Sequence, residues 1–121
     1  MTMRRHIFVN LGFFAREIFN LVFSPVFIML TIVGNGFIGL VGTAFFYIET
    51  SVNPDMLFID AIWWSFATAT TTGYGDITPV TILGKILGIL TMLSGTALFA
   101  MYTGLFAEAL LNSENFRKKS K

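Results

Sequence analysis

The residues best suited to a specific function lie in one stretch, residues 70–76, with the sequence TTTGYGD. An extended backbone points successive carbonyls to opposite sides, but glycine can adopt a positive φ and turn them the same way. Gly73 and Gly75, with Tyr74 between them, therefore permit a ladder of oxygens, to which Thr71 adds a hydroxyl. Such a ladder can replace the water around a cation. One chain supplies only part of each ring, so we expect several copies to converge around an axis.

The Gly-x-Gly pattern alone is a weak signal, because an ordinary loop between two helices can contain it. Its surroundings favour the cation site. Residues 26–48 contain no charged side chain, and a second uncharged run covers residues 86–107. Each run is long enough to cross a hydrocarbon core of about 30 Å. We expect an outer transmembrane helix over residues 26–48 and an inner one over residues 82–110.

Between these runs, residues 56–70 form a shorter apolar segment, interrupted by Asp60, that cannot span the membrane. The Asn-Pro-Asp sequence at residues 53–55 predicts the start of a helix. A helix that enters the membrane and returns needs protein or a water-filled cavity around it. The sequence therefore predicts an all-α membrane protein, in which two transmembrane helices flank a re-entrant pore helix (56–70) and a filter strand (71–76, the filter segment).

The chain ends hold most of the positive charge, since seven of the eight Lys and Arg residues lie before residue 17 or after residue 116. The positive-inside rule predicts a multi-pass protein of the cell membrane with both termini in the cytoplasm. Residues 1–25 show helical apolar spacing, which predicts an amphipathic interfacial helix, with a frayed tail as the alternative. Residues 111–121 are expected to form a basic cytoplasmic tail, explained by topology and not by nucleic-acid binding.

Composition argues against an enzyme. Only 12% of the residues are charged, whereas soluble domains average about 25%. The chain has no cysteine, and its one histidine is His6. Ser65 and Ser94 therefore have no histidine that we expect to serve as the base for a serine nucleophile. We expect no catalytic activity and no cofactor.

The run WWSFATATTTGYGD (63–76), followed by ITPVT, resembles the pore region of two-transmembrane potassium channels of bacterial or archaeal type. The resemblance covers residues 26–110 and implies a homotetramer, formed with three further copies, that conducts K⁺ passively through the lipid bilayer. It implies that the K⁺-binding selectivity filter consists of Thr71, Thr72, Gly73, Tyr74 and Gly75. The implied K⁺ ligands are the carbonyls of the first four residues and the Thr71 hydroxyl.

The residues around the filter also have expected roles. Trp63 and Trp64 are expected to pack around Tyr74, and Asp76 is the nearest partner for a buried indole N–H group. By the resemblance, Gly95 matches the gating hinge of the inner helix. The resemblance also assigns a cavity and inner mouth to residues that share one helical face, namely Thr96, Phe99, Thr103 and Ala107. The next residue, Glu108, either joins a ring of carboxylates at this mouth or pairs with a basic residue such as Arg16.

Two positions depart from the family pattern. Thr72 stands where many members have valine, so the filter gains a hydroxyl that needs a partner behind it. Ala67 stands where some members have a glutamate that braces the aspartate after the filter, and alanine cannot do this.

Two alternative functions remain at this level: a subunit of a potassium transporter, and a membrane assembly subunit without a pore. The gating stimulus is also open. The chain contains no run of arginines at every third position, so the sequence predicts no voltage sensor of that kind in it. A cytoplasmic regulatory domain beyond Lys121 is a further candidate partner.

Overall fold

The structure, a computed structural model, describes residue 12 and residues 14–119. Its named helices are α2 (Pro25–Glu49), α3 (Phe58–Ala69) and α4 (Ile82–Lys119). No β-strand occurs in this part of the chain, so the fold is all-α, and the filter segment is an irregular run without a β-ladder. The chain divides into two compact units, unit 1 (Met1–Leu30 and Met101–Lys121) and unit 2 (Thr31–Ala100).

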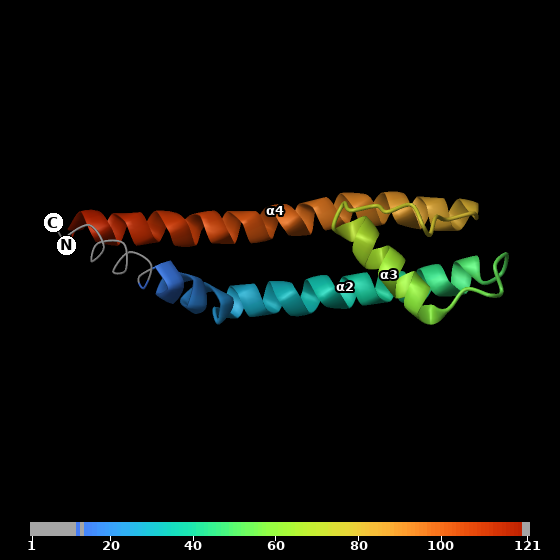
Figure 1. Ribbon diagram of the computed structural model, residues 1–121, viewed down its shortest axis with the longest axis horizontal. Coiled ribbons are helices and arrows are strands. Elements are labelled where there is room, and N and C mark those ends of the chain that lie inside the picture. The colour runs from blue at the N-terminus through green and yellow to red at the C-terminus, as the bar shows by residue number, and fades with distance from the viewer. Residues whose placement is uncertain (1–11, 13, 120–121) are drawn as a thin grey trace, which may run out of the picture. The chain divides into compact units, whose positions relative to one another are not determined.

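In unit 2, α3 lies between α2 and α4 (Figure 1). The buried cluster joins Val41 and Phe45 of α2 to Ala61 and Trp64 of α3. The rings of Phe45 and Trp64 stack with centroids 3.6 Å apart and an interplanar angle of 12°. Aromatic contacts of this kind bury a large apolar area at one point, so they fix α3 against α2.

Glycines allow the helices of unit 2 to approach closely. A methyl group at Gly42 would lie 2.7 Å from Ile62 Cδ1 and 2.9 Å from Ser65 Oγ. On α4, a methyl group at Gly88 would contact the Trp64 ring, and one at Gly95 would overlap the backbone of Ala69. Side chains at these positions would therefore push α3 away from its neighbours.

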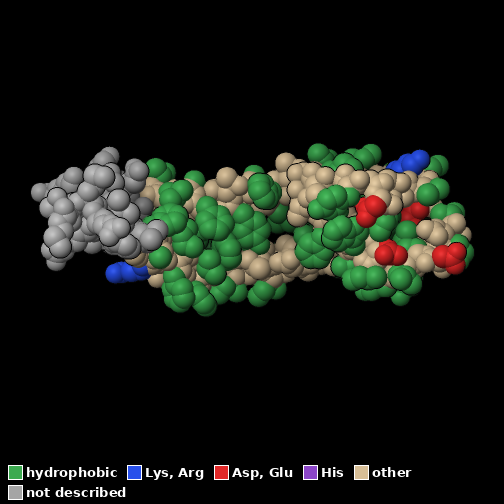
Figure 2. All heavy atoms as spheres, in the orientation of Figure 1, with side chains coloured by type: hydrophobic (Ala, Val, Ile, Leu, Met, Phe, Trp, Pro, Cys, Tyr) green, Lys and Arg blue, Asp and Glu red, His purple; other side chains and the backbone are tan. Residues whose placement is uncertain are grey.

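The outer surfaces of α2 and α4 are apolar and exposed in the single chain (Figure 2). The candidate membrane spans are Pro25–Glu49 and Ile82–Asn112, and only 22% of the most apolar window of each is buried. The core helix of a soluble protein would be mostly buried, so these helices need lipid or further protein chains to cover them.

Two helices have ends that differ from the expected bounds. The short helix begins at Phe58, because Asp60 Oδ2 accepts a 3.0 Å hydrogen bond from the Leu57 N–H and caps the helix there; residues 54 and 55 form a turn. The second long helix extends beyond the expected residue 110. It continues to Lys119, because residues 111–119 contain neither glycine nor proline to end it.

In unit 1, residues 14–22 are helical, and the Ser24 hydroxyl accepts a 3.2 Å hydrogen bond from the Phe27 N–H at the start of α2. Pro25 follows at the first helical position, where its missing N–H has no cost. The Phe27 ring packs edge-on against Tyr102 and Phe106, with centroids 5.4 and 6.0 Å away. The rest of the predicted interfacial helix, residues 1–11 and 13, lies outside the described residues.

These contacts predict that Gly42→Ala destabilises the protein by about 1–3 kcal/mol, because the added methyl group overpacks the contact with Ile62 and Ser65. Gly39→Ala is the matched control, since a methyl group there meets nothing within 4 Å in the chain. The midpoint of thermal unfolding in detergent measures both. Equal midpoints for the two variants would contradict the close-packing argument.

Candidate functional site

The backbone of the filter segment alternates in handedness. Thr71, Gly73 and Gly75 have φ angles of +61°, +55° and +78°, and no other described residue has a positive φ. The two glycines are those that the sequence singled out. The third position, Thr71, was not anticipated, because β-branched residues rarely adopt this conformation.

The end of α3 explains the conformation of Thr71. The Thr71 N–H donates to Thr68 O at 3.1 Å, and the Thr72 N–H donates to Ala67 O at 2.9 Å. These two bonds, with a left-handed residue between helix and loop, form a Schellman motif, in which glycine is the usual left-handed residue. The same turn therefore ends the pore helix and begins the filter segment.

Two successive N–H groups converge on one carbonyl, because the Gly73 N–H also donates to Ala67 O, at 3.0 Å. No described peptide bond is cis, and a trans peptide points its C=O opposite to its N–H. The carbonyls of Thr71 and Thr72 therefore both point away from α3. Two successive carbonyls with the same direction are the arrangement from which a ladder of oxygens can be built.

Trp63 and Asp76 connect the outer end of the segment to α3. The Trp63 Nε1–H donates a 2.8 Å hydrogen bond to Asp76 Oδ2, which confirms the predicted pair. The Trp63 ring also stacks on Tyr74, with centroids 5.3 Å apart and an interplanar angle of 8°. Trp64 lies elsewhere: it packs against Phe45 and not against Tyr74 of its own chain.

Glu49 is a structural residue that the sequence analysis missed. Its side chain is fully buried, and its carboxylate accepts hydrogen bonds from the Val80 N–H at 2.9 Å and the Thr81 N–H at 3.1 Å. The Thr81 hydroxyl donates to it at 2.6 Å and accepts from the Gly84 N–H, which caps α4. A lone acid directly after an uncharged span was the available signal. Glu49 thus joins the end of α2 to the start of α4.

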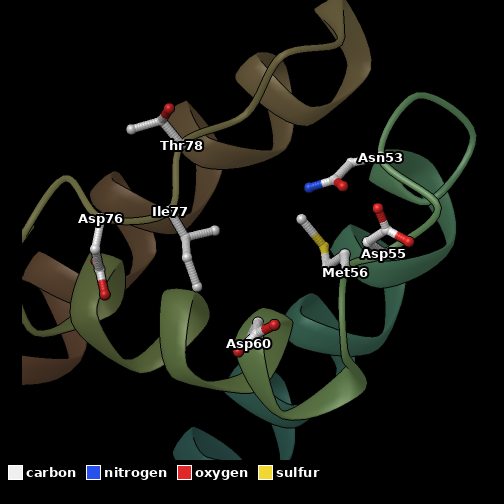
Figure 3. Close-up of a pocket in the computed structure, with 7 residues that line it drawn as sticks. All are labelled: Asn53, Asp55, Met56, Asp60, Asp76, Ile77 and Thr78. Carbon is white, nitrogen blue, oxygen red and sulfur yellow. The ribbon is translucent and has the colours of Figure 1, made fainter.

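An acidic cavity of about 560 Å³ lies beside the outer end of the filter segment (Figure 3). Its lining residues are Asn53, Asp55, Met56, Asp60, Asp76, Ile77 and Thr78. Acidic side chains gather at this end of unit 2 (Figure 2). Within the described residues, no group of three or more acidic, histidine or cysteine side chains could hold a metal ion.

The predicted inner-helix residues fall into both units. Gly95 is buried against Ala69, inside a helix that continues unbroken on both sides. Thr96 and Phe99 belong to unit 2, whereas the last three predicted residues of this group, Thr103, Ala107 and Glu108, belong to unit 1 and are exposed.

A model of the protein family described as "Ion channel" matches residues 18–112. The chain therefore belongs to this family of ion channels, whose function is transport without a chemical step, and it is a membrane protein with two candidate spans.

Potassium channels are among its relatives. A voltage-gated potassium channel of Aeropyrum pernix is 49% identical over 37% of this chain and 15% of its own length. A cyclic nucleotide-gated potassium channel of Rhizobium etli is 41% identical over 51% of this chain and 18% of its own. The human potassium voltage-gated channel subfamily KQT member 4 is 37% identical over 69% of this chain and 13% of its own length. The chain thus spans less than one fifth of the length of these relatives.

The Glu49 contacts predict that Glu49→Gln lowers the free energy of unfolding by about 1–3 kcal/mol. The two carboxylate oxygens of Glu49 accept from three donors, whereas a glutamine amide has one oxygen acceptor and places an NH2 group at the other position. Glu17→Gln, the same change on the helical stretch before α2, should leave the protein unaffected. Thermal unfolding in detergent measures both variants. A Glu49→Gln midpoint equal to that of the parent would show that the carboxylate does not hold this junction.

Proposed function

We propose that four copies of this chain form a potassium-selective pore that conducts K⁺ passively. The observation that carries the proposal is the convergence of the Thr72 and Gly73 N–H groups on Ala67 O, which turns two successive carbonyls to one side. The names of the relatives, all potassium channels, support K⁺ as the ion.

The K⁺ ligands in this proposal are the carbonyls of Thr71, Thr72, Gly73 and Tyr74, with the Thr71 hydroxyl at the inner end and Gly75 completing the segment. A single chain supplies one quarter of each oxygen ring. Every residue from Thr71 to Asp76 is exposed in the single chain, which supports a site completed by three further copies.

The residues behind the filter hold it in place. Trp63 and Asp76 connect its outer end to α3, and Trp64 keeps α3 against α2. Two spans place both termini on one side of the membrane, and the positive charge near the chain ends supports the cytoplasm of a cell-membrane protein as that side. The acidic cavity then opens to the outside.

Gly95 is the proposed hinge of the inner helix, and Thr96, Phe99, Thr103 and Ala107 are the proposed lining of the cavity and inner mouth. Bending at Gly95 would alter its contact with Ala69, the last residue of the pore helix. A cytoplasmic regulatory domain outside this chain is a proposed partner, because one relative is named as cyclic nucleotide-gated.

Ion flux from purified protein in liposomes tests the proposed function. We expect K⁺ to flow down its gradient, Na⁺ to be excluded, and Gly75→Ala to lose this preference, since alanine is strained at the φ of +78° found there. No flux would favour an assembly subunit, and flux against a gradient would favour a transporter.

The Glu108 side chains of the four copies are proposed to form a ring of carboxylates at the inner mouth. Within the described part of the chain, Arg16 and Glu108 form no ion pair, and both side chains are exposed. A ring of carboxylates raises the local K⁺ concentration over a Debye length of about 10 Å at 0.1 M salt.

We therefore expect Glu108→Gln to reduce the outward unitary current at low ionic strength, with a difference that fades as salt is added. Single-channel recording at several salt concentrations measures this. A current that does not respond to the substitution at low salt would instead favour pairing of Glu108 with a basic residue of the N-terminal helix.

A further inference from the structure

Two threonine hydroxyls lie behind the inner part of the filter segment. Thr70 Oγ1 and Thr72 Oγ1 are 2.9 Å apart, which is hydrogen-bond distance for two hydroxyls. Thr70 Oγ1 is also 2.7 Å from Phe66 O and 3.4 Å from Ala67 O, both in the last turn of α3.

The direction of the bond between the two hydroxyls follows from counting hydrogens. A carbonyl oxygen only accepts, so the single hydroxyl hydrogen of Thr70 is directed to the carbonyls of α3. Thr70 Oγ1 then accepts, and the Thr72 hydroxyl is the donor. The result is a chain of two bonds from Thr72 through Thr70 to Phe66 O. Successive bonds of this kind polarise and strengthen one another.

We propose that this hydroxyl chain makes Thr72 a positioning residue for ion conduction, by tethering the filter segment to the pore helix through its side chain. The inference rests on the proposed function, in which the Thr72 carbonyl is a K⁺ ligand.

The tether acts where the backbone is otherwise weakly held. The direction of the Thr72 carbonyl depends on the orientation of the peptide between Thr72 and Gly73. Gly73 has no side chain to hold this peptide, and even a Cβ atom at its position would meet nothing within 4 Å. Among the described residues of the single chain, this peptide is otherwise held by the 3.0 Å bond from the Gly73 N–H to Ala67 O. The hydroxyl chain adds a second restraint from the same turn of α3.

The need for such a restraint grows when ions are scarce. Carbonyl dipoles that point at one axis from four copies repel one another, and a bound cation offsets this repulsion. With fewer bound ions, the contacts behind the filter have to hold the carbonyls in place.

Single-channel recording in planar bilayers tests the tether, with K⁺ at high and at low concentration. Thr72→Val keeps the shape of the side chain but removes the donor, so we expect the mean conducting dwell time to fall about fivefold, and further at low K⁺. Thr72→Ser keeps the hydroxyl and should restore the parent dwell time. Thr70→Val removes the acceptor and should match Thr72→Val, and the double variant should be no worse than either.

The matched control is Thr43→Val, which removes a hydroxyl that donates to Gly39 O at 2.9 Å within α2. It should leave the dwell time unchanged, and all variants should retain the thermal midpoint of the tetramer. Parent dwell times for Thr72→Val, or equally short ones for Thr72→Ser, would overturn the tether while leaving the proposed function intact. A parent protein that does not discriminate K⁺ from Na⁺ would overturn the proposed function itself.

Discussion

The structure depends on how the backbone leaves the end of α3 inside a membrane. Polar backbone groups left without a partner at membrane depth are costly, so the departing chain satisfies its N–H groups within the protein. The carbonyl of Ala67 meets this need for two N–H groups at once, those of Thr72 and Gly73. Because a trans peptide holds its C=O opposite to its N–H, satisfying the donors also sets the direction of the acceptors. Helix termination and the proposed ion site are therefore one structural event.

This arrangement has a conformational cost at Thr71, whose φ of +61° is strained for a β-branched residue. Glycine would fit the turn better but would remove the hydroxyl proposed as an inner K⁺ ligand. The turn also changes how the helix end interacts with ions. The carbonyls of Phe66, Ala67 and Thr68 all accept hydrogen bonds from the residues that follow, so they are not free to face an ion.

A segment held this way is useful only if α3 itself is fixed. Stacking of Trp64 on Phe45, and close approach at Gly42 and Gly95, seat α3 between the two long helices. The Trp63–Asp76 bond fixes the outer end of the filter segment, and Glu49 closes the junction that follows it. The filter segment is thus restrained at both ends by the helices that flank it.

Features that depend on neighbouring residues could be predicted from the sequence. Uncharged runs predict the spans, and Gly73 and Gly75 predict the alternating backbone, because hydropathy and φ preference are local properties. The pairing of Trp63 with Asp76 could also be predicted, since an indole N–H packed behind the filter segment needs an acceptor and Asp76 is the nearest one. Other features could be found only in the folded chain. Thr71 takes a strained φ at the turn that ends α3, against the preference of a β-branched residue. Glu49 meets Thr81 across 32 residues, a contact that depends on how the helices pack.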